Sequence, residues 1–98
     1  MFDPQGLEAH SGEAADLLAA MGNQKRMMIL CNLAKGEMQV GALAEKVALS
    51  QSALSQHLAK LRTRNLVKTR RDAQAIYYSI DSEPVQLLLR TLSDIYCR

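Results

Sequence analysis

Features that mark membrane, secreted or disordered proteins are scarce in this chain. Its 98 residues include only two prolines and five glycines, which argues against disorder or low complexity. No apolar run approaches the roughly 18 residues needed to cross a bilayer. No lysine or arginine precedes Lys25, whereas a secretory signal begins with a positively charged stretch. We therefore expect a single globular, cytoplasmic domain over residues 1–98.

Residue patterns for enzyme chemistry are scarce as well. The chain has two cysteines and two histidines, and they are scattered in the sequence. No Cys-x-x-Cys motif, no Cys/His pair in sequence context and no glycine-rich phosphate loop is present. We therefore expect neither enzymatic activity nor a cofactor.

Charge is unevenly distributed, although the net charge is only +2. Residues 1–24 hold four acidic and no basic residues, whereas residues 60–71 hold six basic and no acidic ones. A basic block in a near-neutral chain is the electrostatic footprint of a polyanion site. The alternative is a charged face that is merely solvated.

The spacing of apolar residues predicts a mainly helical domain with one small β-hairpin. Asn23 can cap the second helix, Gly36 can end it, and Pro84 suits the first turn of the last helix. The expected helices are Glu8–Met21, Gln24–Lys35, Val40–Ala48, Gln51–Arg64 and Glu83–Cys97, and the expected strands are Leu66–Arg71 and Ala75–Ile80. The order α-α-α-α-β-β-α is that of a winged helix-turn-helix.

The stretch Val40–Leu61 predicts the DNA-reading unit, because it contains two short helices joined by a tight turn. Ser50 ends that turn and is placed to cap the second helix. A glutamine amide can pair with adenine through a donor and an acceptor together, and serine can bind bases or phosphates. The outward polar residues predicted to read bases are Gln51, Ser52, Ser55 and Gln56.

Other side chains are better suited to the DNA backbone. Ser50 and Lys60 flank the predicted reading face. A basic hairpin tip can contact phosphates or enter a narrow minor groove, and this hairpin carries Lys68, Arg70 and Arg71. His57 lies at the edge of the apolar face, where it is either a packing residue or a further DNA contact. The alternative for the whole face is that glutamine and serine only solvate an exposed helix.

Long stretches of this sequence resemble the ArsR/SmtB family of bacterial repressors. The similarity rests on VGALA from Val40, LSQSALSQHL from Leu49 and RDAQ from Arg71, and it extends over about residues 14–97. The resemblance implies a homodimeric transcriptional repressor that dimerises through its first and last helices. It also implies binding to double-stranded DNA at an inverted-repeat operator and release by an inducer.

The metal sites known in this family have no counterpart in the sequence. One uses a Cys-x-Cys-type motif at the start of the third helix, where this chain reads Glu37-Met38-Gln39-Val40-Gly41 without thiols. Another uses Asp and His residues on the last helix, which here contains no histidine. Because zinc and arsenic sites need several such ligands together, we predict no metal site. A metal-responsive repressor is the least favoured alternative.

Two cysteines instead resemble those of a dithiol branch of the family. Cys31 follows Ile29-Leu30, and Cys97 follows Ile95-Tyr96. The resemblance implies that reactive sulfur species or oxidants link the two thiols through a disulfide or polysulfide bridge and so lower DNA affinity. Lys35, one turn after Cys31, favours the reactive thiolate. The alternatives are an ArsR-type repressor without thiol sensing, in which Cys31 is a small core residue and Cys97 an end residue, and, remotely, a thiol enzyme.

Overall fold

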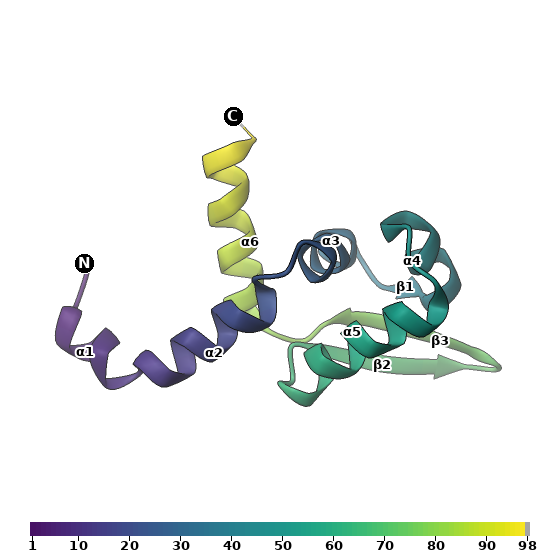
Figure 1. Cartoon of the computed structure of the whole chain (residues 1–98), viewed down its shortest axis with the longest axis horizontal. Coiled ribbons are helices and arrows are strands. Elements are labelled where there is room, and N and C mark those ends of the chain that lie inside the picture. The colour runs from purple at the N-terminus through teal and green to yellow at the C-terminus, as the bar shows by residue number, and fades with distance from the viewer. Residues whose placement is uncertain (98) are drawn as a thin grey trace.

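A computed structural model describes residues 1–97 and has the predicted winged helix-turn-helix architecture (Figure 1). Six helices and three strands follow one another along the described chain. They are α1 (Pro4–Ala9), α2 (Ser11–Met21), α3 (Gln24–Leu33), β1 (Met38–Gln39), α4 (Val40–Val47), α5 (Gln51–Thr63), β2 (Val67–Asp72), β3 (Ala75–Ile80) and α6 (Glu83–Tyr96). The predicted elements are all present, with boundaries that differ by one or two residues except at the N-terminus.

The N-terminal region differs from the single helix predicted over Glu8–Met21. A separate short helix, α1, forms first because Asp3 Oδ1 accepts a hydrogen bond from the Gly6 backbone N–H at 3.0 Å. Pro4 follows this cap, where its fixed φ and missing N–H are tolerated. The chain leaves the helical conformation at His10 before α2 begins.

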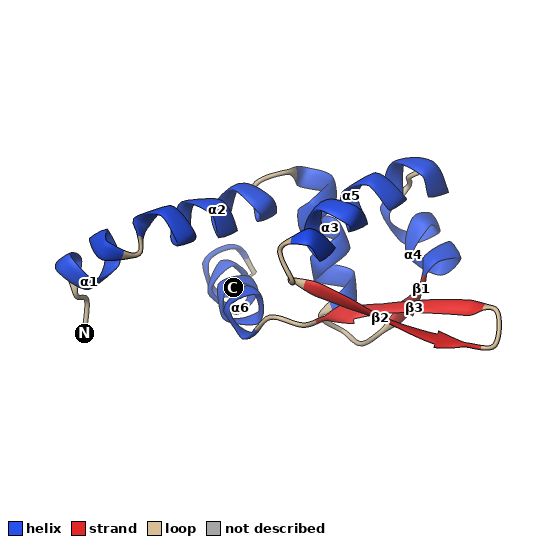
Figure 2. Ribbon diagram, turned by 90° about the horizontal axis from the view of Figure 1, so that it is seen from below, coloured by secondary structure: helices blue, strands red, loops and turns tan. Residues whose placement is uncertain are grey.

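The three strands form one antiparallel sheet in the order β1-β3-β2. Strands β2 and β3 make the wing, which extends beyond the helical body in Figure 2. The two-residue strand β1 was not predicted, and it pairs Met38 with Tyr78 and Gln39 with Tyr77 of β3. Because β1 leads directly into α4, this pairing ties the helix-turn-helix to the wing.

The core lies where α3, α4 and α5 meet the sheet. Helix α5 turns an apolar stripe inward, because Leu54, Leu58 and Leu61 recur at intervals of three or four residues and are fully buried. Their partners are Ile29, Leu30, Leu33, Leu43, Ala44, Val47, Leu66, Val67 and Ile80. This packing fixes one face of α5 and leaves its opposite face to solvent.

Helix α6 is only lightly anchored to the rest of the chain. Among the described residues of α6, Val85 alone is buried. The helix stands away from the body in Figure 1, and α1 and α2 also extend outward on that side. Much of the predicted apolar face of α6 is therefore exposed in the single chain.

Candidate DNA interface and thiol pair

The turn between α4 and α5 sets the direction of the second helix. Ala48 has a left-handed backbone with φ of 55°, and Leu49 N–H donates to Ala44 O at 3.1 Å. Ser50 Oγ then accepts from the Ala53 N–H at 3.1 Å, so the predicted N-cap is confirmed. The free C-terminal end of α4 is also satisfied, because Lys25 Nζ donates to Val47 O at 2.7 Å.

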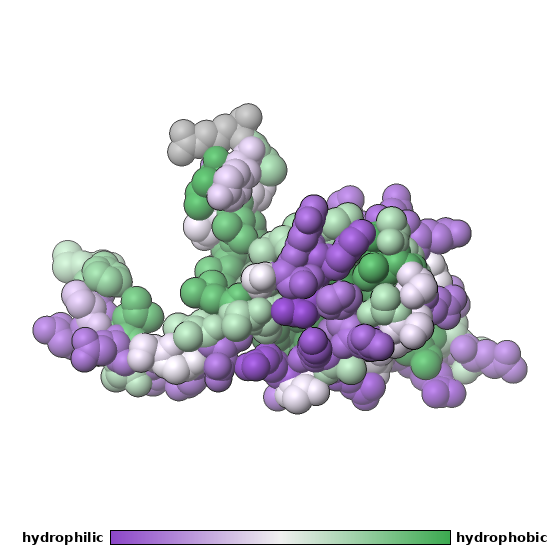
Figure 3. All heavy atoms as spheres, viewed as in Figure 1, coloured by the Kyte–Doolittle hydropathy of each residue, from purple (hydrophilic) through white to green (hydrophobic). Residues whose placement is uncertain are grey.

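The four residues predicted to read bases all lie at the exposed start of α5. Ser52, Ser55 and Gln56 are exposed in the first two turns. A Cβ atom placed on Gly41 would lie 4.0 Å from Gln51 Nε2, so the Gln51 amide lies against the first turn of α4. Figure 3 shows hydrophilic side chains gathered over α5 and α3 on the face turned toward the viewer.

His57 is partly enclosed rather than fully presented to solvent. Its Nδ1 is buried and has no hydrogen-bond partner among the described residues. Burial lowers the pKa of His57, and the nearby positive charges of Arg26 and Lys60 lower the pKa further. Both effects favour the neutral imidazole over the charged form.

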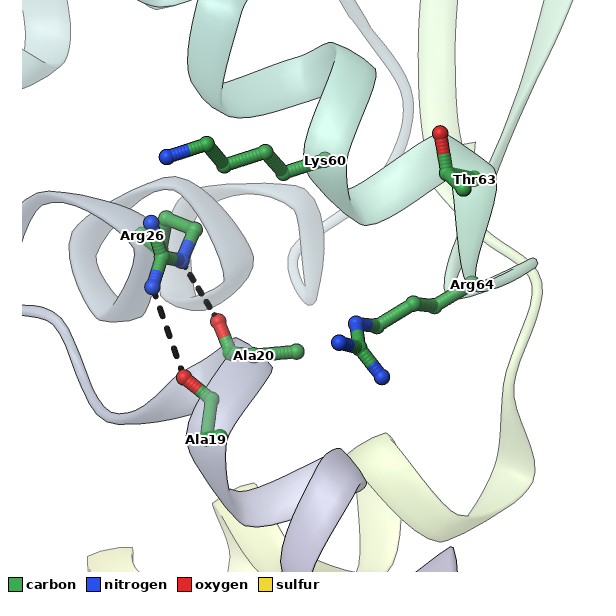
Figure 4. Close-up of a pocket in the computed structure, with 6 residues that line it drawn as sticks. All are labelled: Ala19, Ala20, Arg26, Lys60, Thr63 and Arg64. Carbon is green, nitrogen blue, oxygen red and sulfur yellow. Dashed lines mark hydrogen bonds between the residues drawn. The ribbon is translucent and has the colours of Figure 1, made fainter.

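Lys60 lies beside two arginines that the sequence reasoning did not select. Arg26, Lys60 and Arg64 line a hollow of about 370 Å³ together with Ala19, Ala20 and Thr63 (Figure 4). Arg26 lies on α3, and Lys60 belongs to the second half of α5. Lys60 and Arg64 both belong to the basic block at residues 60–71, whereas Arg26 joins them only through folding.

The basic residues of the wing differ in how free they are to bind a ligand. Arg70 donates to Glu37 from Nε at 3.1 Å and from Nη2 at 2.5 Å, and its guanidinium lies 4.6 Å from the Tyr77 ring centre. The hydrogen bond from Arg70 lowers the pKa of Glu37, against a smaller opposing effect of desolvation. Lys68 Nζ makes only a long, exposed pair with Asp81 at 3.8 Å. Arg70 is thus already engaged within the wing, whereas Lys68 and the exposed Arg71 are available to a ligand.

The two cysteines come together at the junction of α3 and α6. Cys31 and Cys97 line a single cavity of about 500 Å³, and both are exposed as free thiols. The other lining residues are mostly apolar: Met27, Leu89, Leu92, Ser93 and Tyr96. Because Cys31 is exposed, its alternative role as a small core residue does not hold. The two thiols are 66 positions apart in the sequence, so only the fold could place both on the wall of one cavity.

Comparison with known proteins identifies the family. Residues 23–69, from the cap of α3 into the wing, match the family described as bacterial regulatory protein, arsR family. Nodulation protein NolR of Rhizobium meliloti is 66% identical over 83 residues, which cover 85% of this chain and 68% of NolR. The chain belongs to the ArsR family. It is therefore a DNA-binding transcriptional regulator with a winged helix-turn-helix.

Other family members extend the similarity to almost the whole chain. Transcriptional activator HlyU of Vibrio cholerae is 46% identical over 94 residues, covering 96% of this chain and 87% of HlyU. The crystal structure of the transcriptional repressor BigR from Xylella fastidiosa matches with a TM-score of 0.93 at 32% identity and 99% coverage of both chains. A homodimeric winged helix-turn-helix domain from Mycobacterium bovis matches with a TM-score of 0.79 at 29% identity, covering 97% and 86%. HlyU and BigR are regulators by name rather than enzymes.

Residues 1–97 contain neither a membrane-spanning helix nor a cluster of metal ligands. No helix in this range combines the length and apolarity that a membrane span requires. Within the same range, no three His, Cys, Asp or Glu side chains come together to hold a metal ion.

Proposed function

We propose that the protein is a homodimeric transcriptional repressor that reads an inverted-repeat operator with α5. The observation that carries this proposal is the exposed polar start of α5, held by the Ser50 cap and a buried leucine stripe. In this arrangement α5 enters the major groove, where Gln56 pairs with adenine and Ser52 and Ser55 contact neighbouring bases or phosphates. Gln51, at the start of α5, contacts DNA at the edge of this reading face that lies next to α4.

The exposed apolar faces of α2 and α6 support dimerisation. Leu18 on α2 is 57% exposed, and Ile95 and Tyr96 on α6 are 55% and 79% exposed. A small domain gains stability by burying such surface against a second copy, and the related Mycobacterium bovis domain is homodimeric. A symmetric pair presents two reading helices to half-sites that lie one helical turn, about 34 Å, apart.

The wing and the flanks of α5 complete the proposed interface. Lys68 and Arg71 bind backbone phosphates beside the half-site, together with Lys60. Arg70 contributes mainly by holding the wing to Glu37, and it joins the DNA only if that ion pair is exchanged. His57 packs against the basic side chains of α3 and α5 and contributes at most one neutral hydrogen bond.

The DNA-binding part is tested with Gln56→Ala and a matched control, Gln5→Ala, on the exposed surface of α1. Footprinting on the promoter region of the protein's own operon supplies the operator, and fluorescence anisotropy then gives Kd. We expect Gln56→Ala to weaken operator binding about 10- to 100-fold per half-site and to relax the preference over unrelated DNA. Equal affinities of the two variants would contradict base reading by Gln56.

The shared thiol cavity supports a second part of the proposal, which is regulation by Cys31 and Cys97. A Cys31 thiolate attacks the outer sulfur of a persulfide, RSSH, forming Cys31–SSH and releasing RSH. Cys97 then attacks the Cys31 sulfur and expels H₂S, leaving a Cys31–Cys97 disulfide. The sulfane sulfur is reduced as the two thiols are oxidised, and further sulfane sulfur would give a polysulfide bridge. Such a bridge links α3 to α6 and alters the placement of the two reading helices.

Mass spectrometry and anisotropy on Cys31→Ser and Cys97→Ser test this regulation. Persulfide treatment should remove two hydrogens from the parent, or add sulfur between the thiols, and should lower its operator affinity. Each variant should retain its affinity after the same treatment. If treated variants lose DNA as the parent does, the protein is a repressor in which the thiols are incidental.

A further inference from the structure

The hollow lined by Arg26, Lys60 and Arg64 (the basic hollow) combines three positive charges in a small space. In Figure 4 the Lys60 side chain extends along the top of the hollow, the Arg64 side chain enters from the right, and the Arg26 guanidinium lies at the left. Like charges that lie close together repel one another, and a bound anion would offset that repulsion. The hollow is therefore electrostatically suited to a phosphate.

Each positive charge of the basic hollow remains available to a ligand. Arg26 donates through Nε to Ala20 O at 2.6 Å and through Nη2 to Ala19 O at 3.4 Å, which leaves others of its five N–H donors unused. Lys60 is exposed and has no ion-pair partner among residues 1–97. Arg64 pairs with Asp16 at 3.9 Å, but their side chains are 46% and 71% exposed. An exposed pair of this length contributes little and exchanges readily.

The position of the basic hollow points to DNA as the source of the phosphate. Gln56, Lys60 and Arg64 follow one another at intervals of four residues, so they form one stripe along α5. Along this stripe, the residue proposed to read bases is followed directly by two residues that line the hollow. All three of these side chains are exposed.

We propose that the basic hollow binds a backbone phosphate of the DNA strand that passes beside the half-site. This inference rests on the proposed function and adds Arg26 and Arg64 to the interface. Lys60 supplies a point charge, and the planar guanidinium of Arg64 leaves Asp16 to donate two parallel hydrogen bonds to the phosphate. Arg26 lies at the back of the hollow, where its contacts with the end of α2 hold its charge in place.

The test is the dependence of DNA affinity on salt, because each phosphate contact releases condensed counterions. The variants are Lys60→Gln and Arg64→Gln, and the matched control is Lys35→Gln, an exposed lysine beyond the opposite end of α3 from Arg26. For a dimer, each hollow variant should reduce the slope of log K against log salt by about 1.8, on operator and unrelated duplexes alike. Lys35→Gln should leave the slope unchanged. Asp16→Asn should tighten binding to both duplexes, because Arg64 no longer has to leave a carboxylate.

The outcomes separate this inference from the proposed function. Unchanged slopes for Lys60→Gln and Arg64→Gln, or an equal fall for Lys35→Gln, would overturn the phosphate site even if Gln56→Ala still abolished operator preference. A parent protein without operator preference would refute base reading, whereas the slopes on unrelated duplexes would still test the hollow. A further titration uses inorganic phosphate, monitored by NMR of the arginine side chains. Submillimolar phosphate binding that Arg64→Gln abolishes, with no change in DNA slope, would assign the hollow to a free anion and overturn the DNA contact.

Discussion

Ser50 stabilises the first turn of α5 and also lies in the proposed DNA interface. Three substitutions at this position can separate the two roles. Its hydroxyl caps the first turn of α5 by accepting from the Ala53 N–H at 3.1 Å. Removing such a cap with alanine costs about 1 kcal/mol. For a domain of this size, that loss lowers the thermal midpoint by about 4–8 °C. We expect Ser50→Ala to show this shift in circular dichroism melts at fixed protein concentration, which matters for a dimer.

Ser50→Asn and Ser50→Asp retain a capping oxygen and so provide the controls. Both should unfold at or above the parent midpoint, and the aspartate gains about 0.3–1 kcal/mol from its charge at the helix N-terminus. On DNA they should diverge, because a carboxylate at this end of α5 repels phosphate and an amide does not. The reasoning fails if Ser50→Ala melts with the parent, or if Ser50→Asp binds the operator as tightly as Ser50→Asn.

Three further predictions concern the wing and the thiols. Glu37→Gln should lower the free energy of unfolding at pH 7. Because Arg70 holds the pKa of Glu37 below its ordinary value of 4.5, this contribution is present above that value and disappears as pH falls through the lower folded pKa. Denaturation of parent and variant should therefore converge in acid, and a constant difference across pH would contradict the ion pair. Ala73→Gly should stabilise the hairpin by up to about 1 kcal/mol, since Ala73 has a φ of 57° at the first position of a two-residue turn; a lower urea midpoint would refute this. A Cys31–Cys97 bridge closes a loop of about 67 residues and should raise the free energy of unfolding by about 4 kcal/mol. If the oxidised and the reduced protein unfold at the same denaturant concentration, the bridge is not an unstrained one.

Local signals were sufficient to predict the helix-turn-helix. The cap at Ser50, the buried stripe of Leu54, Leu58 and Leu61, and the left-handed Asn65 with φ of 60° all follow from nearby residue types. The separate helix α1 was also open to prediction, because Asp3-Pro4 is a cap followed by a first-turn proline. The pattern of alanines and leucines further along instead suggested one longer helix.

Contacts between distant segments were beyond the reach of periodicity. Strand β1 has two residues, which is too short to show an alternating pattern, and its register depends on β3. The Glu37–Arg70 pair joins residues 33 positions apart, and nothing in the sequence indicated that Arg70, a predicted DNA contact, would meet a carboxylate. The basic hollow has the same origin, because Arg26 meets Lys60 only when α3 packs against α5.

Helix α3 contributes a residue to each of the two proposed sites, so a movement of this helix affects both sites. Arg26 at its first turn closes the basic hollow, and Cys31 in its second half faces the cavity shared with Cys97. The ten residues between Gln24 and Leu33 form one continuous helix, about 15 Å long, that behaves as a rigid body. Its buried residues Ile29, Leu30 and Leu33 belong to the same core as the inward leucines of α5. A bridge that pulls α3 toward α6 therefore has to move Arg26 relative to Lys60, or strain a closely packed core. Loss of DNA on thiol oxidation would then act partly through the proposed backbone phosphate contact, independently of the proposed base contacts of Gln56.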